Sequence, residues 1–143
     1  MSDNVHHLSP LLRQSSDILV ERAQGMYVYA EDGGKYMDFA SGIGVLSTGH
    51  CHPRVVEAAK AQIDRVVHAQ YAIMKHRPIL ELSDRIVELL PDHIDSVFFS
   101  NAGTEAVEAS IRLARQATGK PNIIAFRGCF HGRTMGSLST TTS

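Results

Sequence analysis

The sequence predicts an α/β protein, and two changes of hydrophobic pattern along its 143 residues carry that prediction. Up to about residue 49, short β-type segments such as ILVERAQG and MYVYAEDGGKYMDFA are broken by turns, and Asp32-Gly33 is a typical hairpin turn. From Pro53 onward, apolar residues recur at the spacing of an α-helix. Further on, a helical pattern lies between two short apolar runs, the order expected of two parallel strands joined by a crossover helix.

Three helices are expected after the β-type segments. The first two each begin beside a proline, Pro53 and Pro78, because proline is favoured in the first turn of a helix. Their apolar positions are Val55, Ala59, Ile63 and Val66 in the first, and Ile79, Leu82, Ile86 and Leu89 in the second. Pro91 should end the second helix, while the third should run from about Thr104 to Ala117 and stop at Gly119.

The third helix is flanked by two expected strands, SVFFS at residues 96–100 and NIIAF at residues 122–126. A right-handed crossover would place them parallel in one sheet. Two such strands alone would leave their edges and faces exposed. We therefore expect this sequence to be the front part of a longer chain.

Composition narrows the class of protein. With 43% hydrophobic residues the chain can bury a core, and its net charge of -1 gives no attraction to nucleic acid or anionic lipid. Two cysteines, Cys51 and Cys129, do not make a disulfide framework. The start MSDNVHHLSPLLRQ lacks the pattern of a secretory signal, and no apolar run approaches the ~18 residues of a membrane span. A soluble cytoplasmic protein is expected.

The junction SNAGTEA, where the first expected strand meets the third helix, is a candidate anion site. Free N–H groups and the helix dipole favour an anion there, Gly103 allows close approach, and Thr104 can add a hydroxyl. The alternative is that Asn101 and Thr104 only cap the helix. Glu105 and Glu108 would repel a phosphate, so they must point away from it.

No metal site is predicted. His50, Cys51 and His52 stand too close together in sequence for one tetrahedral site, and no second pair of ligands completes it. The nucleotide-binding signatures are absent as well, since Gly42-Ile43-Gly44 lacks the third glycine of a dinucleotide fingerprint.

Three blocks occur together: YMDFASGIGVLSTGHCHPRVVEA, SNAGTEAVEASIRLAR and FRGCFHGRT. In this order and spacing they resemble the N-terminal part of a class III, or omega-amino-acid, aminotransferase. This fold-type-I family depends on pyridoxal 5′-phosphate and includes 4-aminobutyrate and acetylornithine aminotransferases. The resemblance runs from about Val20 to the end of the sequence. It implies that residues 1–50 belong to the small domain and residues 51–143 begin the large, cofactor-binding domain.

The resemblance also implies roles for five residues. Gly103 and Thr104 would bind the cofactor phosphate, and Phe130 would stack on the pyridine ring. Arg133 would pair with the substrate carboxylate, which suits its planar guanidinium. Ile43 would line the substrate pocket. The alternatives are a core aromatic at Phe130, a surface arginine at Arg133 and a plain turn at Ile43.

The implied reaction moves an amino group from a 4-aminobutyrate-like omega-amino acid to a 2-oxo acid such as 2-oxoglutarate, and the full-length enzyme is expected to be a homodimer. The family reaction needs a lysine that forms a Schiff base with the cofactor. The four lysines, none in the matching context, are Lys35, Lys60, Lys75 and Lys120. No catalytic residue is therefore assigned, and the chain is expected to be truncated before that lysine.

Three alternatives remain open. An acetylornithine-type aminotransferase and a class III aminomutase share these motifs. An alternative of another class is an inactive product that binds a phosphorylated ligand or pairs with a full-length subunit.

Overall fold

The computed structural model describes residues 7–9, 11 and 14–143, which form two compact units, Met1–Ala69 and Gln70–Ser143. Each unit is described by itself. Most of the N-terminal stretch used above to argue against a secretory signal lies outside the described residues. Within the described ranges, no helix combines the length and the apolar character needed to cross a membrane.

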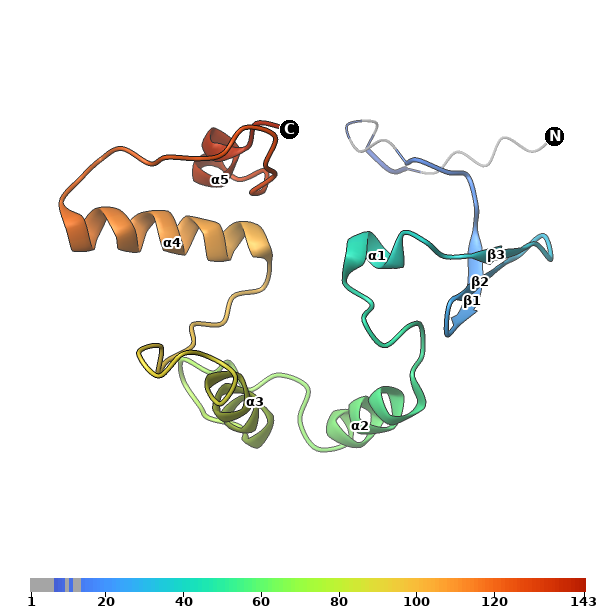
Figure 1. Cartoon of the computed structure of the whole chain (residues 1–143). Helices are drawn as coiled ribbons and strands as arrows, with labels where there is room; N and C mark the ends of the chain where they lie inside the picture. Colours follow the sequence, from blue (N-terminus) through green and yellow to red (C-terminus); the bar gives the residue numbers. More distant parts are fainter. Residues whose placement is uncertain (1–6, 10, 12–13) are drawn as a thin grey trace. The chain divides into compact units, whose positions relative to one another are not determined.

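The first unit contains an antiparallel sheet of three strands, β1 (Val20–Gln24), β2 (Tyr27–Ala30) and β3 (Lys35–Met37), in the order β1-β2-β3 (Figure 1). The predicted hairpin turn is confirmed between β2 and β3. Gly33 there has φ +85°, which favours glycine, and the Asp32 carboxylate accepts a hydrogen bond from the Gly34 N–H at 2.8 Å.

Two further elements of the first unit follow the sheet, α1 (Ser41–Gly44) and α2 (Pro53–Ile63). The α2 helix begins at Pro53, as predicted, although it ends at Ile63 rather than near Val66. The glycine-rich stretch at α1 is a left-handed turn, since its four residues have φ values of 48°, 59°, 69° and 79°. Ser41 and Ile43 are strained in this conformation because both carry a Cβ.

The second unit contains α3 (Arg77–Val87), α4 (Gly103–Thr118) and α5 (Met135–Thr140) (Figure 1). The α4 helix ends at Gly119, which has φ +68°, so the predicted glycine stop is confirmed. The short α5 helix is not predicted by the sequence patterns. It packs against α4.

The two predicted strands of the second unit are not formed. Residues 96–100 and 122–126 have no strand assignment, so the described chain holds no parallel pair. A strand needs a hydrogen-bonded neighbour, and along 96–100 the main-chain carbonyl of Phe99 instead accepts a bond from the Tyr71 hydroxyl at 2.8 Å. The mixture of helix and strand agrees with the α/β class, but the second unit builds no sheet.

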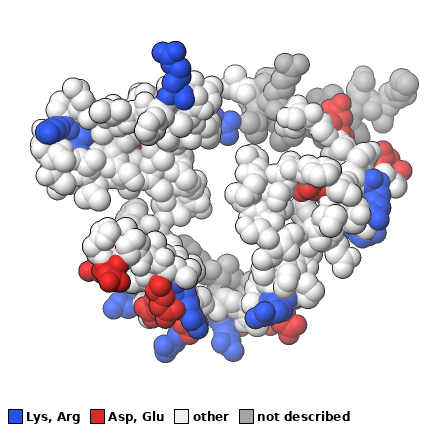
Figure 2. Space-filling view, viewed as in Figure 1, with Lys and Arg blue, Asp and Glu red and all other residues white. Residues whose placement is uncertain are grey.

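The expectation of a buried core is also wrong for the described residues. Ala30, 4% exposed, is the one buried hydrophobic residue among them. Large apolar side chains such as Ile124 and Phe126 remain 96% and 82% exposed. Figure 2 shows charges of both signs scattered over a surface that is formed mostly by uncharged residues.

Candidate cofactor and substrate site

The N-terminus of α4 has two N–H groups free for a ligand. Glu105 turns back so that its Oε2 accepts bonds from the N–H groups of Asn101 at 2.7 Å and Ala102 at 3.0 Å. Among the described residues, the N–H groups of Gly103 and Thr104 have no acceptor, and neither Asn101 nor Thr104 caps the helix with its side chain. The alternative that Asn101 and Thr104 only cap α4 is therefore wrong.

The Thr104 hydroxyl lies between α4 and α5. Its Oγ1 is 2.6 Å from Ser137 Oγ and 2.7 Å from Thr134 Oγ1. Ser137 is fully buried. The side chain that sequence reasoning assigned to the phosphate is thus already part of a hydroxyl cluster, which that reasoning did not find.

Glu108, one helical turn after Thr104, binds the start of α5. Its Oε1 accepts bonds from the Thr134 hydroxyl at 2.6 Å and from the N–H groups of Gly136 at 2.7 Å and Ser137 at 3.2 Å. The Thr134 hydroxyl lowers the pKa of Glu108 most, followed by the Ser137 N–H, while burial opposes the shift. Both glutamates of the motif therefore bind N–H groups other than those of Gly103 and Thr104, Glu108 at the start of α5 and Glu105 at the two residues directly before Gly103.

The loop that carries Phe130 and Arg133 folds onto Thr104 at Gly132. Gly132 is buried with φ +126°, and a Cβ there would collide with Thr104 Oγ1. Two residues at the end of the chain fasten this loop. Thr141 Oγ1 accepts the His131 N–H at 3.0 Å, and Thr142 Oγ1 accepts the Gly128 N–H at 2.7 Å.

The structure thus brings four of the five predicted site residues into one region of the second unit. Phe130 is 62% exposed, which excludes the core-aromatic alternative within this unit. Arg133 is exposed and makes no hydrogen bond or ion pair within the described chain. The two free N–H groups and the open space at Gly103, where a Cβ would meet nothing within 4 Å, fit a phosphate group.

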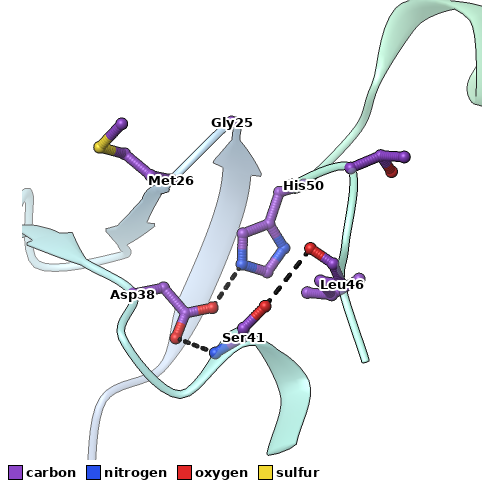
Figure 3. A pocket seen from close by; sticks show the side chains of 8 residues that line it. Gly25, Met26, Asp38, Ser41, Leu46 and His50 are labelled. Atoms are coloured by element: carbon purple, nitrogen blue, oxygen red, sulfur yellow. Dashed lines mark hydrogen bonds and ion pairs between the residues drawn. The ribbon is translucent and has the colours of Figure 1, made fainter. Parts of the chain in front are cut away.

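Ile43 lies in the first unit, at the left-handed turn, with its side chain 95% exposed. Asp38 holds this turn, because its Oδ1 accepts the N–H groups of Ala40 at 2.8 Å and Ser41 at 2.9 Å. Its other oxygen is 2.7 Å from His50 Nε2 (Figure 3). Ile43 thus lies in a turn, and this turn is strained and anchored by Asp38.

The pair of Asp38 and His50 borders a cavity of about 300 Å³ beside Gly25 and Met26 (Figure 3). The His50 ring lowers the pKa of Asp38 most, followed by the Ser41 N–H. Sequence reasoning considered His50 only as a metal ligand and missed its carboxylate partner. No group of three or more metal-binding side chains occurs in the part of the chain that the structure describes.

The sequence model of the class-III aminotransferases matches residues 11–143. The chain therefore belongs to the class-III aminotransferase family, a family of pyridoxal-phosphate-dependent enzymes of fold type I, and the resemblance predicted from the three blocks is confirmed.

Relatives and solved structures agree with this family. An acetylornithine aminotransferase of Methanopyrus kandleri is 46% identical over 118 residues, 82% of this chain and 30% of the relative. The 4-aminobutyrate aminotransferase GabT of Escherichia coli is 39% identical over 129 residues, 90% of this chain and 30% of the relative. An omega transaminase of Pseudomonas jessenii, solved in complex with PMP, superposes with a TM-score of 0.83 at 27% identity, covering 96% of this chain and 33% of that one.

The chain thus spans about a third of the length of the relatives it matches.

Proposed function

We propose that this chain contributes the phosphate-binding and substrate-facing part of an aminotransferase. The enzyme would move the distal amino group of a 4-aminobutyrate-like omega-amino acid to a 2-oxo acid such as 2-oxoglutarate, using pyridoxal 5′-phosphate. The observation that supports this most is the fold of the Phe130–Arg133 loop onto the first turn of α4, where two N–H groups have no acceptor in the part of the chain that the structure describes. Family membership over residues 11–143 supports the reaction class.

Each residue of the site would act in a defined way. The N–H groups of Gly103 and Thr104 would bind the phosphate, and the exposed ring of Phe130 would cover the pyridine ring. Arg133 would form a paired hydrogen bond with the substrate carboxylate, while Ile43 would contact the apolar part of the substrate. When bound, pyridoxal phosphate supplies the carbonyl that takes up the amino group and a ring that withdraws electrons.

The proposal extends to organisation and setting. Residues 1–50 would belong to the small domain and residues 51–143 to the large domain, in a homodimer that works in the cytoplasm. No lysine of this chain is assigned to the Schiff base. Borohydride reduction with pyridoxal phosphate, followed by digestion, tests that assignment. A stoichiometric pyridoxyl group on Lys35, Lys60, Lys75 or Lys120 would contradict it.

The proposed binding of the substrate carboxylate by Arg133 is tested by replacing this residue. In the whole enzyme, Arg133→Met should raise KM for 4-aminobutyrate by about tenfold or more, since a hydrogen-bonded charge pair to a carboxylate is lost. KM for an amine donor that has no carboxylate should stay within about twofold, because it makes no such pair. Equal effects on both donors would overturn the role of Arg133.

Acetylornithine is the second candidate donor, favoured by the 46% identity to an acetylornithine aminotransferase. Comparing kcat/KM for acetylornithine and 4-aminobutyrate with 2-oxoglutarate as acceptor decides between the two. A preference for acetylornithine would replace the first candidate. Conversion of a substrate without any added 2-oxo acid would instead indicate an aminomutase.

A further inference from the structure

The hydroxyl cluster between α4 and α5 has one consistent direction of hydrogen bonding. The Glu108 carboxylate can only accept, so Thr134, 2.6 Å away, donates its one hydroxyl hydrogen to Glu108. Thr134 Oγ1 then accepts from Thr104 at 2.7 Å, and Thr104 Oγ1 accepts from Ser137 at 2.6 Å. Three hydroxyl hydrogens thus occupy the three shortest contacts of the cluster, and the chain of bonds ends on Glu108.

Thr134 is the residue at which this chain of bonds reaches the main chain of the loop. Its hydroxyl accepts from Thr104 and donates to Glu108, and its N–H donates to Ser137 Oγ at 3.1 Å. Thr134 is also the residue directly after Arg133. The cluster therefore fixes the main chain on one side of Arg133.

Glu108 holds the residues that follow Thr134 as well. Its Oε1 accepts the N–H groups of Gly136 at 2.7 Å and Ser137 at 3.2 Å. The carboxylate packs so closely against the chain that a Cβ at Gly136 would collide with it. One side chain of α4 thus binds three successive points at the start of α5.

The main chain on the other side of Arg133 is held in a different way. Gly132 is buried, and a Cβ there would collide with Thr104. Arg133 itself is exposed and makes no hydrogen bond or ion pair within the described residues. Its main chain is therefore held at both ends, while its guanidinium is free to bind a ligand.

An arginine that pairs with a carboxylate gains most when its position is set before the ligand arrives, because a small misplacement weakens the paired bonds. We infer that Glu108 is a positioning residue for Arg133, and that it acts through Thr134 to place the guanidinium for the substrate carboxylate. This inference rests on the proposed role of Arg133. Glu108 acts through the main chain and not by contact with the substrate.

Trypsin digestion of the full chain measures how firmly this segment is held. Trypsin cleaves after Arg133 and after Arg127, two exposed arginines of the same loop, and the Glu108 bonds lie beside the first. Glu108→Ala should raise the ratio of the initial cleavage rates after Arg133 and after Arg127 by about fivefold or more, because three bonds are lost. Glu108→Gln should leave this ratio within about twofold of the wild type, because its amide oxygen can still accept these bonds.

The same variants in the whole enzyme separate positioning from a general structural effect. Glu108→Ala should raise KM for 4-aminobutyrate by about fivefold and leave KM for an amine donor without a carboxylate within about twofold, since only 4-aminobutyrate would bind Arg133. Glu108→Gln should restore KM for 4-aminobutyrate. In an Arg133→Met background, Glu108→Ala should raise this KM no further, because both changes act on the same bond.

A second pair of variants repeats the kinetic comparison if Glu108→Ala does not fold. Thr134→Val keeps the volume of the side chain and loses its hydroxyl, and Thr134→Ser, which keeps the hydroxyl, is its matched control. Thr134→Val should raise KM for 4-aminobutyrate alone, and Thr134→Ser should not.

The outcomes distinguish the inference from the proposed function. Equal effects of Arg133→Met on both donors would contradict the proposed carboxylate site itself. If Arg133→Met discriminates between the donors, but Glu108→Ala or Thr134→Val raises both KM values alike or neither, the positioning role alone is overturned. An unchanged cleavage ratio in Glu108→Ala would overturn it as well.

Discussion

At the scale of single residues, Gly132 carries the tightest constraint in the second unit. An alanine there would place its Cβ against Thr104 Oγ1 and 2.7 Å from Ser137 Oγ, in addition to the strain of φ +126°. Overpacking of this kind costs about 1–3 kcal/mol, so Gly132→Ala should lower the free energy of unfolding by about that amount more than a glycine substitution in open space.

Gly128→Ala is the matched control for Gly132→Ala. Gly128 also has positive φ, +82°, but a Cβ there would meet nothing within 4 Å. Denaturant unfolding of the two variants, followed by circular dichroism, separates the collision from the backbone strain. Equal losses of stability would show that the loop does not rest on Thr104 as described.

Asp38 makes the stability of the first unit depend on pH. His50 and the Ser41 N–H hold its pKa below the ordinary 3.8, so the folded state favours the carboxylate. The stabilisation that the ionised Asp38 gives the folded state is fully present above the pKa of about 3.9 that an aspartate has in the unfolded chain. It is lost as the pH falls through the lower pKa of Asp38 in the folded state. The stability difference between wild type and Asp38→Asn should therefore shrink as the pH falls below about 4. A difference that grows as the pH falls through this acid range would contradict a lowered pKa of Asp38.

At the scale of elements, the strain of the left-handed turn α1 should lower the stability of the chain while placing Ile43 to bind the amino donor. Ile43 is 95% exposed and has φ 69°, so its side chain gains no packing to offset a strain of about 1–2 kcal/mol. Ile43→Gly should raise the free energy of unfolding by up to about 1 kcal/mol, after the entropic cost of glycine, while weakening the binding of the amino donor.

Val45→Gly is the control for Ile43→Gly, because Val45 is also exposed, at 73%, but has an ordinary φ of -104°. It should lose about 0.5–1 kcal/mol instead of gaining stability. Thermal unfolding of both variants checks whether the change in stability has opposite signs for Ile43→Gly and Val45→Gly. Loss of stability in both would mean that Ile43 is not held in a strained conformation.

At this scale, the sequence could predict the features that are set by residues of the same turn, but not those that depend on a partner far away along the chain. The start of α2 at Pro53 and the end of α4 at Gly119 follow from single residues acting on their own turn. The strands predicted at 96–100 and 122–126 did not form. A strand forms only beside a hydrogen-bonded neighbour, and no local sequence pattern shows whether that neighbour is present. The short α5 has no apolar repeat of its own, and its first turn is held by Glu108 from another helix, so no local pattern predicts it.

The candidate site shows the same limit. The SNAGTEA motif predicted the free N–H groups of Gly103 and Thr104 from local rules. The partners of Thr104 could not be predicted in this way, since Ser137 and Thr134 are 33 and 30 positions away along the chain. Asp38 and His50, 12 positions apart, were missed for the same reason.

At the scale of the whole molecule, exposed apolar side chains should dominate the behaviour of the chain in solution. Ile124, Phe126 and Phe98 are 96%, 82% and 72% exposed, and a groove on α4 beside Phe98 is lined by Leu113. Exposed apolar surface of this kind drives association. The chain should bind a hydrophobic dye such as anilinonaphthalene sulfonate and should self-associate as its concentration rises.

Replacing both Ile124 and Phe126 by serine tests the source of that association. These side chains make little packing contact, so the double variant should keep its circular dichroism spectrum, while dye fluorescence and light scattering should fall by roughly a tenth, because the two side chains are a small part of the exposed apolar surface. Arg127→Ser, at the adjoining exposed position, changes charge without removing a large apolar side chain and should leave both signals near the wild-type values. A wild-type chain that stays monomeric and binds no dye would show that its apolar side chains are covered in solution.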